Sequence, residues 1–537
     1  MAKPREIAPA GKPTPSTTSE VGCPVNVGVG LRYLDEPCRR PLHNAPQGVD
    51  GQPVCLMHSK DPGKEAGALF EEFMREFEAI LTTAGGGVAS FQNFVFPGLS
   101  LAGRVIQAEC WFENATFTQF ASFNGANFTR DVDFTGAIFT KYTDFSPTTF
   151  TQSACFRNAV FNPDAHFTGA NFLWYADFAG AIFMGDGRFA DVTFRRHASF
   201  SGTTFKHHAW FSRARFTEDA VFSGAAFTDA LFGDVIFTQV ADFKEASFRG
   251  MADWRRSRFL ESAEFHRTEF APQGAGGPSA VFALVRFSKP GEIVFDDVDL
   301  SRALFNHRDV TEVWFTSSVR WGRRSGNRGV AVFEETIPLN QEIAQGLQRD
   351  GQRDFRAVAQ IYQQLKKNYD ARLDYSTANE FHFSEMEMKR LASPTDGPLL
   401  GLRHWWHARL SLVAWYRHAS DYGNSYRRPS ILLLSVLLLF ALLLPLPGVG
   451  LQRSGATHQE TYASVWHAGG SVGQSLRWEV GLAGRSLLTA VDIATFQKST
   501  EYTPAYPAGH ALAIVETLLT STLFALFLLA IRRQFRR

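Results

Sequence analysis

Phenylalanine recurs along the middle of the chain with two alternating gaps. In the stretch "FTGANFLWYADFAGAIF", Phe167, Phe172, Phe178 and Phe183 are separated by five, six and five residues. The same alternation runs through residues 112–270 with a single slip, at Phe227, Phe232 and Phe237, so the repeating unit has eleven residues. A fixed period of this kind predicts a repeat architecture in place of a single globular domain.

Each repeat pairs one large side chain with one small one. The residue two places before the aromatic is usually Ala, and Gly often follows the aromatic by two places, as at Gly169, Gly180, Gly202 and Gly224. A spacing of five to six does not fit the period of two of a half-buried strand. It fits a coil of four sides, each with an inward aromatic, an inward small residue and a turn. We therefore expect the phenylalanines to form a dry core and not a ligand groove.

This pairing resembles the motif of the pentapeptide-repeat proteins, over residues 112–270. The resemblance implies a mainly β fold, the right-handed quadrilateral β-helix. The chain departs from the motif by one extra residue in every second repeat. We therefore expect coils of about 22 residues, with wider corners at two of the four turns.

The remaining composition divides the chain into six regions. A polar tail rich in Pro, Ser and Thr precedes a segment with three Cys, and Leu69, Phe73, Phe77 and Ile80 have helical spacing. We predict a disordered tail over 1–20, a Cys/His segment over 21–65, an amphipathic helix and glycine linker over 66–87, the β-helix over 88–335, a helical linker over 340–395, and an interfacial helix with two transmembrane spans over 400–537.

Two apolar runs near the C-terminus are long enough to cross a bilayer. The first begins at Ser430 and the second covers 511–531. Arg427 and Arg428 precede the first run, and further arginines follow the second. The positive-inside rule then predicts a multi-pass protein of the cell (inner or plasma) membrane, with its N-terminal bulk and its C-terminus in the cytoplasm.

The segment between these runs would lie outside the cell. Residues 485–496 have the composition of a short re-entrant helix. A span, a short helix, a loop and a second span resemble the pore unit of two-span potassium channels, although the TVGYG filter is absent. Asp492 and Glu516 are the acidic residues expected to matter if ions pass.

Cysteine and histidine near the N-terminus have the composition of a zinc site. Cys55 and His58 have a spacing that lets two ligands come from one turn, and Cys23 and Cys38 would complete four ligands. His43 is a competing ligand. We expect a structural zinc ion, because the predicted cytoplasmic location keeps thiols reduced.

The chain shows none of the common catalytic motifs, so we expect no enzyme. The net charge of the chain is +1, and residues 112–270 hold eighteen acidic and fifteen basic side chains. Neither value favours nucleic acid as a partner or the DNA mimicry known in some pentapeptide-repeat proteins. Two hypotheses remain. One is a membrane-anchored scaffold that binds a cytoplasmic protein. The other is a homo-oligomeric pore gated by the β-helix.

Overall fold

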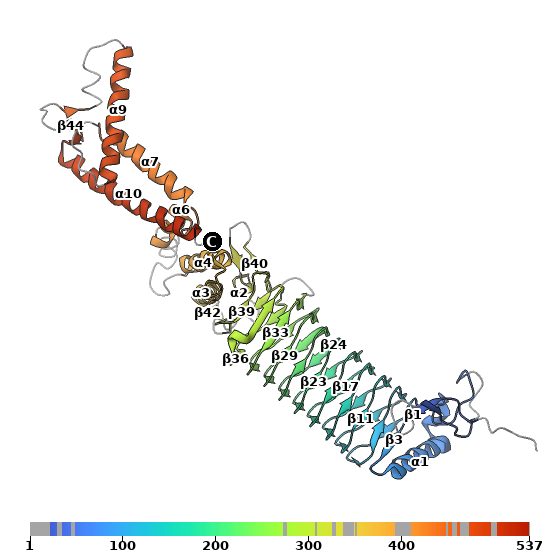
Figure 1. Cartoon of the computed structure of the whole chain (residues 1–537). Helices are drawn as coiled ribbons and strands as arrows, with labels where there is room; N and C mark the ends of the chain where they lie inside the picture. Colours follow the sequence, from blue (N-terminus) through green and yellow to red (C-terminus); the bar gives the residue numbers. More distant parts are fainter. Residues whose placement is uncertain are drawn as a thin grey trace, which may run out of the picture. The chain divides into compact units, whose positions relative to one another are not determined.

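The structure is a computed structural model whose chain divides into two compact units, Met1–Asp299 and Leu300–Arg537 (Figure 1). The residues it describes are 22–28, 35–43, 49–271, 277–306, 309–324, 329–336, 348–349, 352–392, 409, 411–446, 449–453, 459–461, 472–495 and 502–535. The tail expected over 1–20 lies outside these residues.

The first unit is a four-faced β-solenoid, as the repeat predicts (Figure 1). Each face is a ladder of very short parallel strands, one from each coil. Face A consists of β3 (Val88–Ser90), β7 (Glu109–Trp111), β11 (Val132–Asp133), β15 (Ala154–Cys155), β19 (Ala176–Asp177), β23 (Ala198–Ser199), β26 (Ala220–Val221), β29 (Ala241–Asp242), β33 (Ala263–His266) and β37 (Ile293–Asp296). Face B consists of β4 (Val95–Phe96), β8 (Thr116–Phe117), β12 (Ile138–Phe139), β16 (Val160–Phe161), β20 (Ile182–Phe183), the first parts of β24 (Thr204–Trp210) and β27 (Ala226–Leu231), β30 (Ser247–Phe248) and β34 (Glu269–Phe270).

The other two faces complete the coil. Face C consists of β5 (Leu99–Ser100), β9 (Ala121–Ser122), β13 (Thr143–Asp144), β17 (Ala165–His166), β21 (Gly187–Arg188), the second parts of β24 and β27, β31 (Ala252–Asp253) and β35 (Ala280–Val281). Face D is a nine-stranded sheet of β6 (Val105–Ile106), β10 (Asn127–Phe128), β14 (Thr149–Phe150), β18 (Asn171–Phe172), β22 (Thr193–Phe194), β25 (Arg215–Phe216), β28 (Ile236–Phe237), β32 (Arg258–Phe259) and β36 (Arg286–Phe287).

The register confirms a coil of 22 residues, because Phe128 pairs with Phe150 and Phe150 with Phe172. One coil is shorter by a residue. There Phe205 still pairs with Phe227, but Ala209 pairs with Ala230 through a register shift in β24. The single slip in the sequence pattern is thus absorbed by a local bulge, and the ladder continues beyond it.

The core consists of four columns of aromatic rings. Phe178 is fully buried and lies parallel to Phe156 and Phe200 in the neighbouring coils, at 4.8 and 4.9 Å between ring centroids. It meets Phe167 edge-to-face across the coil at 5.4 Å. Phe167, Phe172 and Phe183 are equally buried, which confirms that the ladder is core.

Two of the four corners explain the alternating gaps. In the five-residue gaps the residue two places after the aromatic adopts a left-handed backbone at nearly every coil, for example Gly169, Gly180 and Gly202 with φ of 70°, 70° and 64°. This conformation suits glycine. Asn114 and Asn158 occupy the same corner as Gly180. The other two corners take the six-residue gap, so opposite corners share one geometry, as the sequence predicts.

The amphipathic helix expected near 68–83 is α1 (Gly67–Ala84), which covers the first coil. Its Phe73 and Phe77 are fully buried, and their rings contact Phe91 and Phe96. A solenoid needs such a cap because the end coil has no neighbour to bury its rings.

The second unit begins with irregular strands and two helices. The strands are β38 (Ala303–Leu304), β39 (Trp314–Phe315), β40 (Gly322–Arg323), β41 (Val330–Ala331), β42 (Gln348–Arg349) and β43 (Gln352–Arg353), and α2 covers Phe333–Thr336. The helical linker expected over 340–395 contains the helix pair α3 (Phe355–Ala371) and α4 (Tyr375–Leu391). This pair packs on the strands, since Trp321 Nε1 donates to the Tyr369 hydroxyl at 3.0 Å.

The described residues after α4 form the helices α6 (Leu412–Ser420), α7 (Arg427–Leu443), α9 (Val472–Ala494) and α10 (Pro507–Gln534). A small sheet of β44 (Leu451–Arg453), β45 (Gln459–Glu460) and β46 (Tyr502–Pro504) joins the connections between them. The re-entrant segment expected at 485–496 forms the second half of α9, so that helix is longer than predicted. Among the described residues, one helix, Pro507–Arg533 within α10, is long and apolar enough to cross a membrane.

We expect replacement of one core ring to destabilise the solenoid strongly. The change Phe178→Ala removes two stacking partners and leaves a cavity, with a cost of about 3–5 kcal/mol in the free energy of unfolding. Met184→Ala, at a side chain that is 43% exposed, is the control and should change it by less than about 0.5 kcal/mol. Urea unfolding followed by circular dichroism measures both, and equal midpoints for the two variants would contradict the core assignment.

Candidate metal centre

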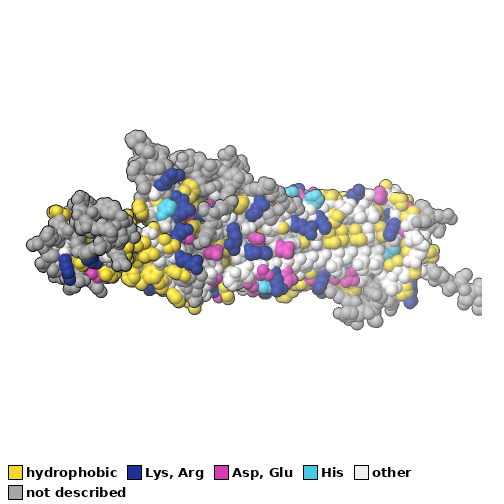
Figure 2. Space-filling model, turned by 90° about the horizontal axis from the view of Figure 1, so that it is seen from above, with side chains coloured by type: hydrophobic (Ala, Val, Ile, Leu, Met, Phe, Trp, Pro, Cys, Tyr) yellow, Lys and Arg dark blue, Asp and Glu magenta, His cyan; other side chains and the backbone are white. Residues whose placement is uncertain are grey.

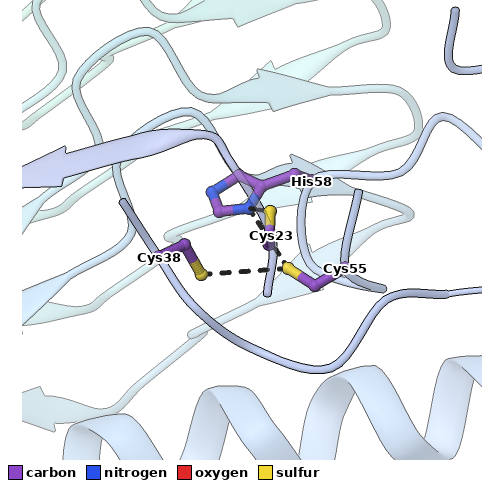
Figure 3. Close-up of side chains that lie close together, drawn as sticks. All are labelled: Cys23, Cys38, Cys55 and His58. Atoms are coloured by element: carbon purple, nitrogen blue, oxygen red, sulfur yellow. Dashed lines mark hydrogen bonds between the residues drawn. The ribbon is translucent and has the colours of Figure 1, made fainter. Parts of the chain in front are cut away.

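Three sulfur atoms and one ring nitrogen converge near the N-terminus. The ligand atoms of Cys23, Cys38, Cys55 and His58 all lie within 4.8 Å of one another (Figure 3). His58 Nδ1 is 3.2 Å from Cys55 Sγ and 3.4 Å from Cys23 Sγ, and the sulfur atoms of Cys38 and Cys55 are 3.9 Å apart. The structure thus brings together all four residues that the sequence predicted.

A hairpin explains how Cys23 and Cys38 meet despite their separation in sequence. Strand β1 (Asn26–Gly28) pairs antiparallel with β2 (Asp35–Pro37). Beyond the paired strands, the Cys23 amide donates to the Arg40 carbonyl at 3.0 Å, and the Cys38 amide to that of Val25 at 2.8 Å. Because the two cysteines flank the hairpin, its length does not affect the distance between them.

One tight turn supplies the other two ligands. The amides of His58 and Ser59 both donate to the Cys55 carbonyl, at 3.1 and 3.0 Å. The turn places the Cys55 sulfur and the His58 ring on the same side. This is the geometry that the short spacing predicted.

Neighbouring groups orient the ligands. His58 Nε2 lies 3.2 Å from the Gln92 carbonyl oxygen, and with Nε2 donating there, Nδ1 presents its lone pair to the cluster. Arg40 Nη1 donates to Cys38 Sγ at 3.2 Å. The pKa of Cys38 is held low, chiefly by a hydrogen bond from the Cys55 thiol, while the same bond and burial raise the pKa of Cys55. The cluster is therefore ready to hold thiolate.

His43 lies outside the cluster and has a different partner. Its Nε2 is 2.9 Å from Asp61 Oδ2. This hydrogen bond lowers the pKa of Asp61, and a hydrogen bond from the Gly63 amide lowers it further. Asp61 in turn caps the short helix η1 (Pro62–Glu65). His43, the competing ligand that the sequence suggested, thus binds within the loop beside the cluster.

A buried lysine ties this loop to the first coil. Lys64 is 1% exposed, and its Nζ donates to the carbonyl oxygens of Leu56, Ser59 and Val95 at 2.6–2.8 Å. Burial lowers the pKa of Lys64 to about 7. Lys64 therefore connects the loop that carries Cys55 and His58 to β4, because two of its hydrogen bonds go to the loop and the third goes to Val95 of β4.

The donor set fits a tetrahedral metal ion. Ligand atoms at ordinary Zn–S and Zn–N lengths lie about 3.4–3.8 Å from one another in a tetrahedron. Three distances in the cluster, 3.2, 3.4 and 3.9 Å, are close to this range. Cys23, Cys55 and His58 are buried, so a bound ion would have no open position for substrate. Such a closed site stabilises a fold and does not perform catalysis.

The other residues singled out in the sequence lie apart from this cluster. Glu516 is buried on α10, and Asp492 is half-buried on α9. Cys110 is buried in the solenoid and Cys155 is half-buried, and burial raises the pKa of each thiol, to about 12 and about 11. No sequence pattern indicated Arg40, Gln92 or Lys64, since their roles arise from contacts between segments that are apart in the chain.

Comparison with known families agrees with the repeat. Residues 105–149, 167–215, 200–246 and 232–273 match the family described as pentapeptide repeats (9 copies). The first unit is a pentapeptide-repeat solenoid. No curated protein and no solved structure matched the chain. The cluster and its α1 cap stand at the N-terminal end of the pentapeptide repeats, ahead of the matched residues.

We expect the purified protein to bind one zinc ion per chain. The variant Cys55→Ser should lose more affinity than the roughly 10–100-fold that removal of an outer-shell partner costs, because it deletes a ligand. Cys155→Ser is the matched control and should keep the ion. Metal analysis and the absorption of a cobalt-substituted sample measure the outcome.

The affinity should also fall as the pH is lowered from about 8 to about 5, because protons compete with the metal for the thiolates and the imidazole. Metal content that is the same in Cys55→Ser and wild type would contradict the site.

Proposed function

We propose that the protein is a non-catalytic, membrane-anchored scaffold whose pentapeptide-repeat solenoid presents its outer faces to a cytoplasmic protein partner. The side chains that point into the solenoid form its packed core, so only the side chains on the outer faces are available to bind a partner. The observation that carries the anchor is the polarity of α10, which is apolar outside and polar inside.

In α10 the exposed side chains are hydrophobic. Ile514 and Leu518 are 63% and 64% exposed, whereas Glu516 and Thr520 on the packed face are 0% and 2% exposed. A helix in water has the opposite arrangement. The arrangement of α10 suits a lipid environment, in which the outer surface meets acyl chains and polar groups lie between helices.

Helix α7 shares this property and packs against α10. Leu434, Leu439 and Leu442 are 59%, 52% and 59% exposed. Figure 2 shows hydrophobic side chains gathered on the surface of the second unit. An exposed apolar surface of this extent is unusual on a soluble monomer. It supports α7 as a second span, although at seventeen residues it is short.

Arginines at the helix ends support the orientation. Arg427 and Arg428 begin α7, and Arg532 and Arg533 end α10. If both helices cross the membrane, the positive-inside rule places these ends in the cytoplasm together with the solenoid. The proposed zinc ion at the Cys23 cluster would then be structural and would clamp the hairpin and the Cys55 turn at the capped end of the solenoid.

We expect the full-length protein to remain in the membrane fraction after alkaline carbonate extraction. The double variant Leu518→Arg/Leu519→Arg should release it or abolish insertion, because each arginine at mid-span costs about 2.5–3.5 kcal/mol. Leu373→Arg is the control, since Leu373 is 71% exposed in the turn between α3 and α4. Wild-type protein that is fully extracted by carbonate would refute the anchor.

A second candidate function is an oligomeric pore, and Glu516 favours it. Both of its carboxylate oxygens are buried, and neither has a hydrogen-bond partner in the part of the chain that the structure describes. Ser486, Thr489 and Thr520 are also buried in these helices. An acid in such a place within a span is costly and is commonly functional.

For this candidate we expect ion flux into liposomes that contain the purified protein. The variant Glu516→Gln should change the flux by an order of magnitude or more, since it removes the charge but keeps the shape. Asp492→Asn, at the half-buried acid of α9, is tested beside it. Flux that is absent from well-inserted protein under varied ions would leave the scaffold as the function.

A further inference from the structure

Face D of the solenoid carries no acidic side chain. Each of its nine strands presents two outward positions, one before and one after the inward residue. These positions are Val105, Gln107, Asn127, Thr129, Thr149, Thr151, Asn171, Leu173, Thr193, Arg195, Arg215, Thr217, Ile236, Thr238, Arg258, Leu260, Arg286 and Ser288. Face A differs, since Asp133, Asp177, Asp242 and Glu264 lie in its outward row. The net charge of the repeat region is small, yet face A carries acidic side chains and face D carries basic ones.

The positive charge of face D is concentrated in its later coils. Arg195, Arg215, Arg258 and Arg286 are all exposed, and we call them the basic face. Arg215 and Arg258 stand two coils apart in one row, with Ile236 between them, and Arg286 follows Arg258 by one coil. At about 4.8 Å per coil, Arg215, Arg258 and Arg286 span about 14 Å.

Four carboxylates along the edges of this face are already paired with arginine or lysine. On one edge Arg213 binds Asp191 through two hydrogen bonds of 2.7 Å, and Arg256 binds Asp234 through two of 3.0 and 2.8 Å. On the other edge Glu218 pairs with Arg196, and Glu261 with Lys289. No ion pair joins any arginine of the basic face to a residue within the described ranges. Four charges are therefore left for an external partner.

A shallow groove lies among these charges. It has a volume of about 560 Å³, and its lining residues are Asp191, Arg213, Arg215, Asp234, Ile236, Arg256 and Arg258. The hydroxyl groups of Thr217, Thr238 and Ser288 stand in the neighbouring outward row. The two carboxylates of this lining, Asp191 and Asp234, are each bound by an arginine of the same edge. The guanidinium groups of Arg215 and Arg258 and the neighbouring hydroxyl groups then form a donor-rich surface that suits phosphate oxygens.

We propose that the basic face docks on an anionic lipid bilayer through its phosphate headgroups. The face is one nine-stranded sheet whose outward arginines share one side, as contact with a bilayer surface requires. The proposal rests on the membrane anchor proposed above, because an anchored solenoid meets the bilayer at a high effective concentration and weak contacts then suffice. Basic side chains beside a membrane are attracted by anionic lipids of the cytoplasmic leaflet.

The test uses full-length protein in two kinds of vesicle, one of phosphatidylcholine and one in which a third of the lipid is phosphatidylglycerol. Phenylglyoxal modifies accessible arginines, and mass spectrometry of peptides gives the rate at each residue. Arg215, Arg258 and Arg286 should react about fivefold more slowly in the anionic vesicles. Arg249, an exposed arginine on face B, is the internal control and should react equally in both. About 1 M salt should remove the protection, because it shortens the Debye length to about 3 Å.

Two double variants, each of which removes two positive charges, test the same proposal. Arg215→Gln/Arg258→Gln should abolish the protection of Arg286, whereas Lys206→Gln/Arg249→Gln, which removes two exposed charges from face B, should leave it intact. Carbonate extraction and flotation on the neutral vesicles report the anchor separately. Equal arginine rates in both vesicles, in protein that stays anchored, would overturn the docking proposal. Protection that appears in detergent without anionic lipid would also overturn it, because it indicates contact with a second copy of the chain. Protection by an oligonucleotide added to neutral vesicles would overturn it as well, because it indicates a soluble polyanion as the partner.

Discussion

Stacking of one coil on the next is the interaction on which the structure depends. A single coil encloses four aromatic rings but leaves both of its flat sides open, so it buries little on its own. Parallel rings in neighbouring coils cover these sides, as Phe156, Phe178 and Phe200 do at centroid distances of 4.8 and 4.9 Å. The same contacts hold the strands at hydrogen-bonding distance, although most strands have only two residues. Core packing and strand pairing therefore stabilise each other, and the terminal coil requires a cap.

The cap connects the metal cluster to the solenoid. Helix α1 covers the first rings, and Lys64 links the Cys55 turn to β4 through backbone carbonyls. Buried hydrogen bonds hold this loop, and a metal ion at the proposed site would stabilise it further. The stability of the whole solenoid thus depends on its weakest end, since unfolding can begin where a coil loses its neighbour.

The sequence was sufficient for those features that follow from local spacing. The Phe and Ala positions predicted the four-sided coil and its length, Gly180 and Gly202 marked the tight corners, and Cys55 with His58 marked a ligand turn. Features that depend on contacts between distant segments were not predictable. The carbonyl of Gln92 beside His58 is one case. The true length of α9 is another, because its first half lacks the apolar pattern of the second.

The distribution of charge over the outer faces could not be predicted from the sequence either. Arg255, Arg256 and Arg258 are neighbours in sequence, yet the fold gives them different surroundings. Arg255 binds Asp253, Arg256 binds Asp234, and Arg258 points from face D without an ion pair to a described residue. A count of charges along the chain cannot separate these three arginines. Ion pairs form between residues 22 apart, in neighbouring coils, and each face contains one side of every coil.

The eleven-residue unit covers two sides of a four-sided coil, and this fact constrains how such a protein can change its length. Gain or loss of a full coil of 22 residues lengthens or shortens the solenoid by about 4.8 Å and leaves every downstream residue on its face. Gain or loss of one eleven-residue unit also preserves the Phe pattern and the core. It would, however, turn each downstream residue to the opposite face, so that arginines of face D would emerge on face B. Duplication of one eleven-residue unit can therefore change which residues each downstream face exposes, without any substitution.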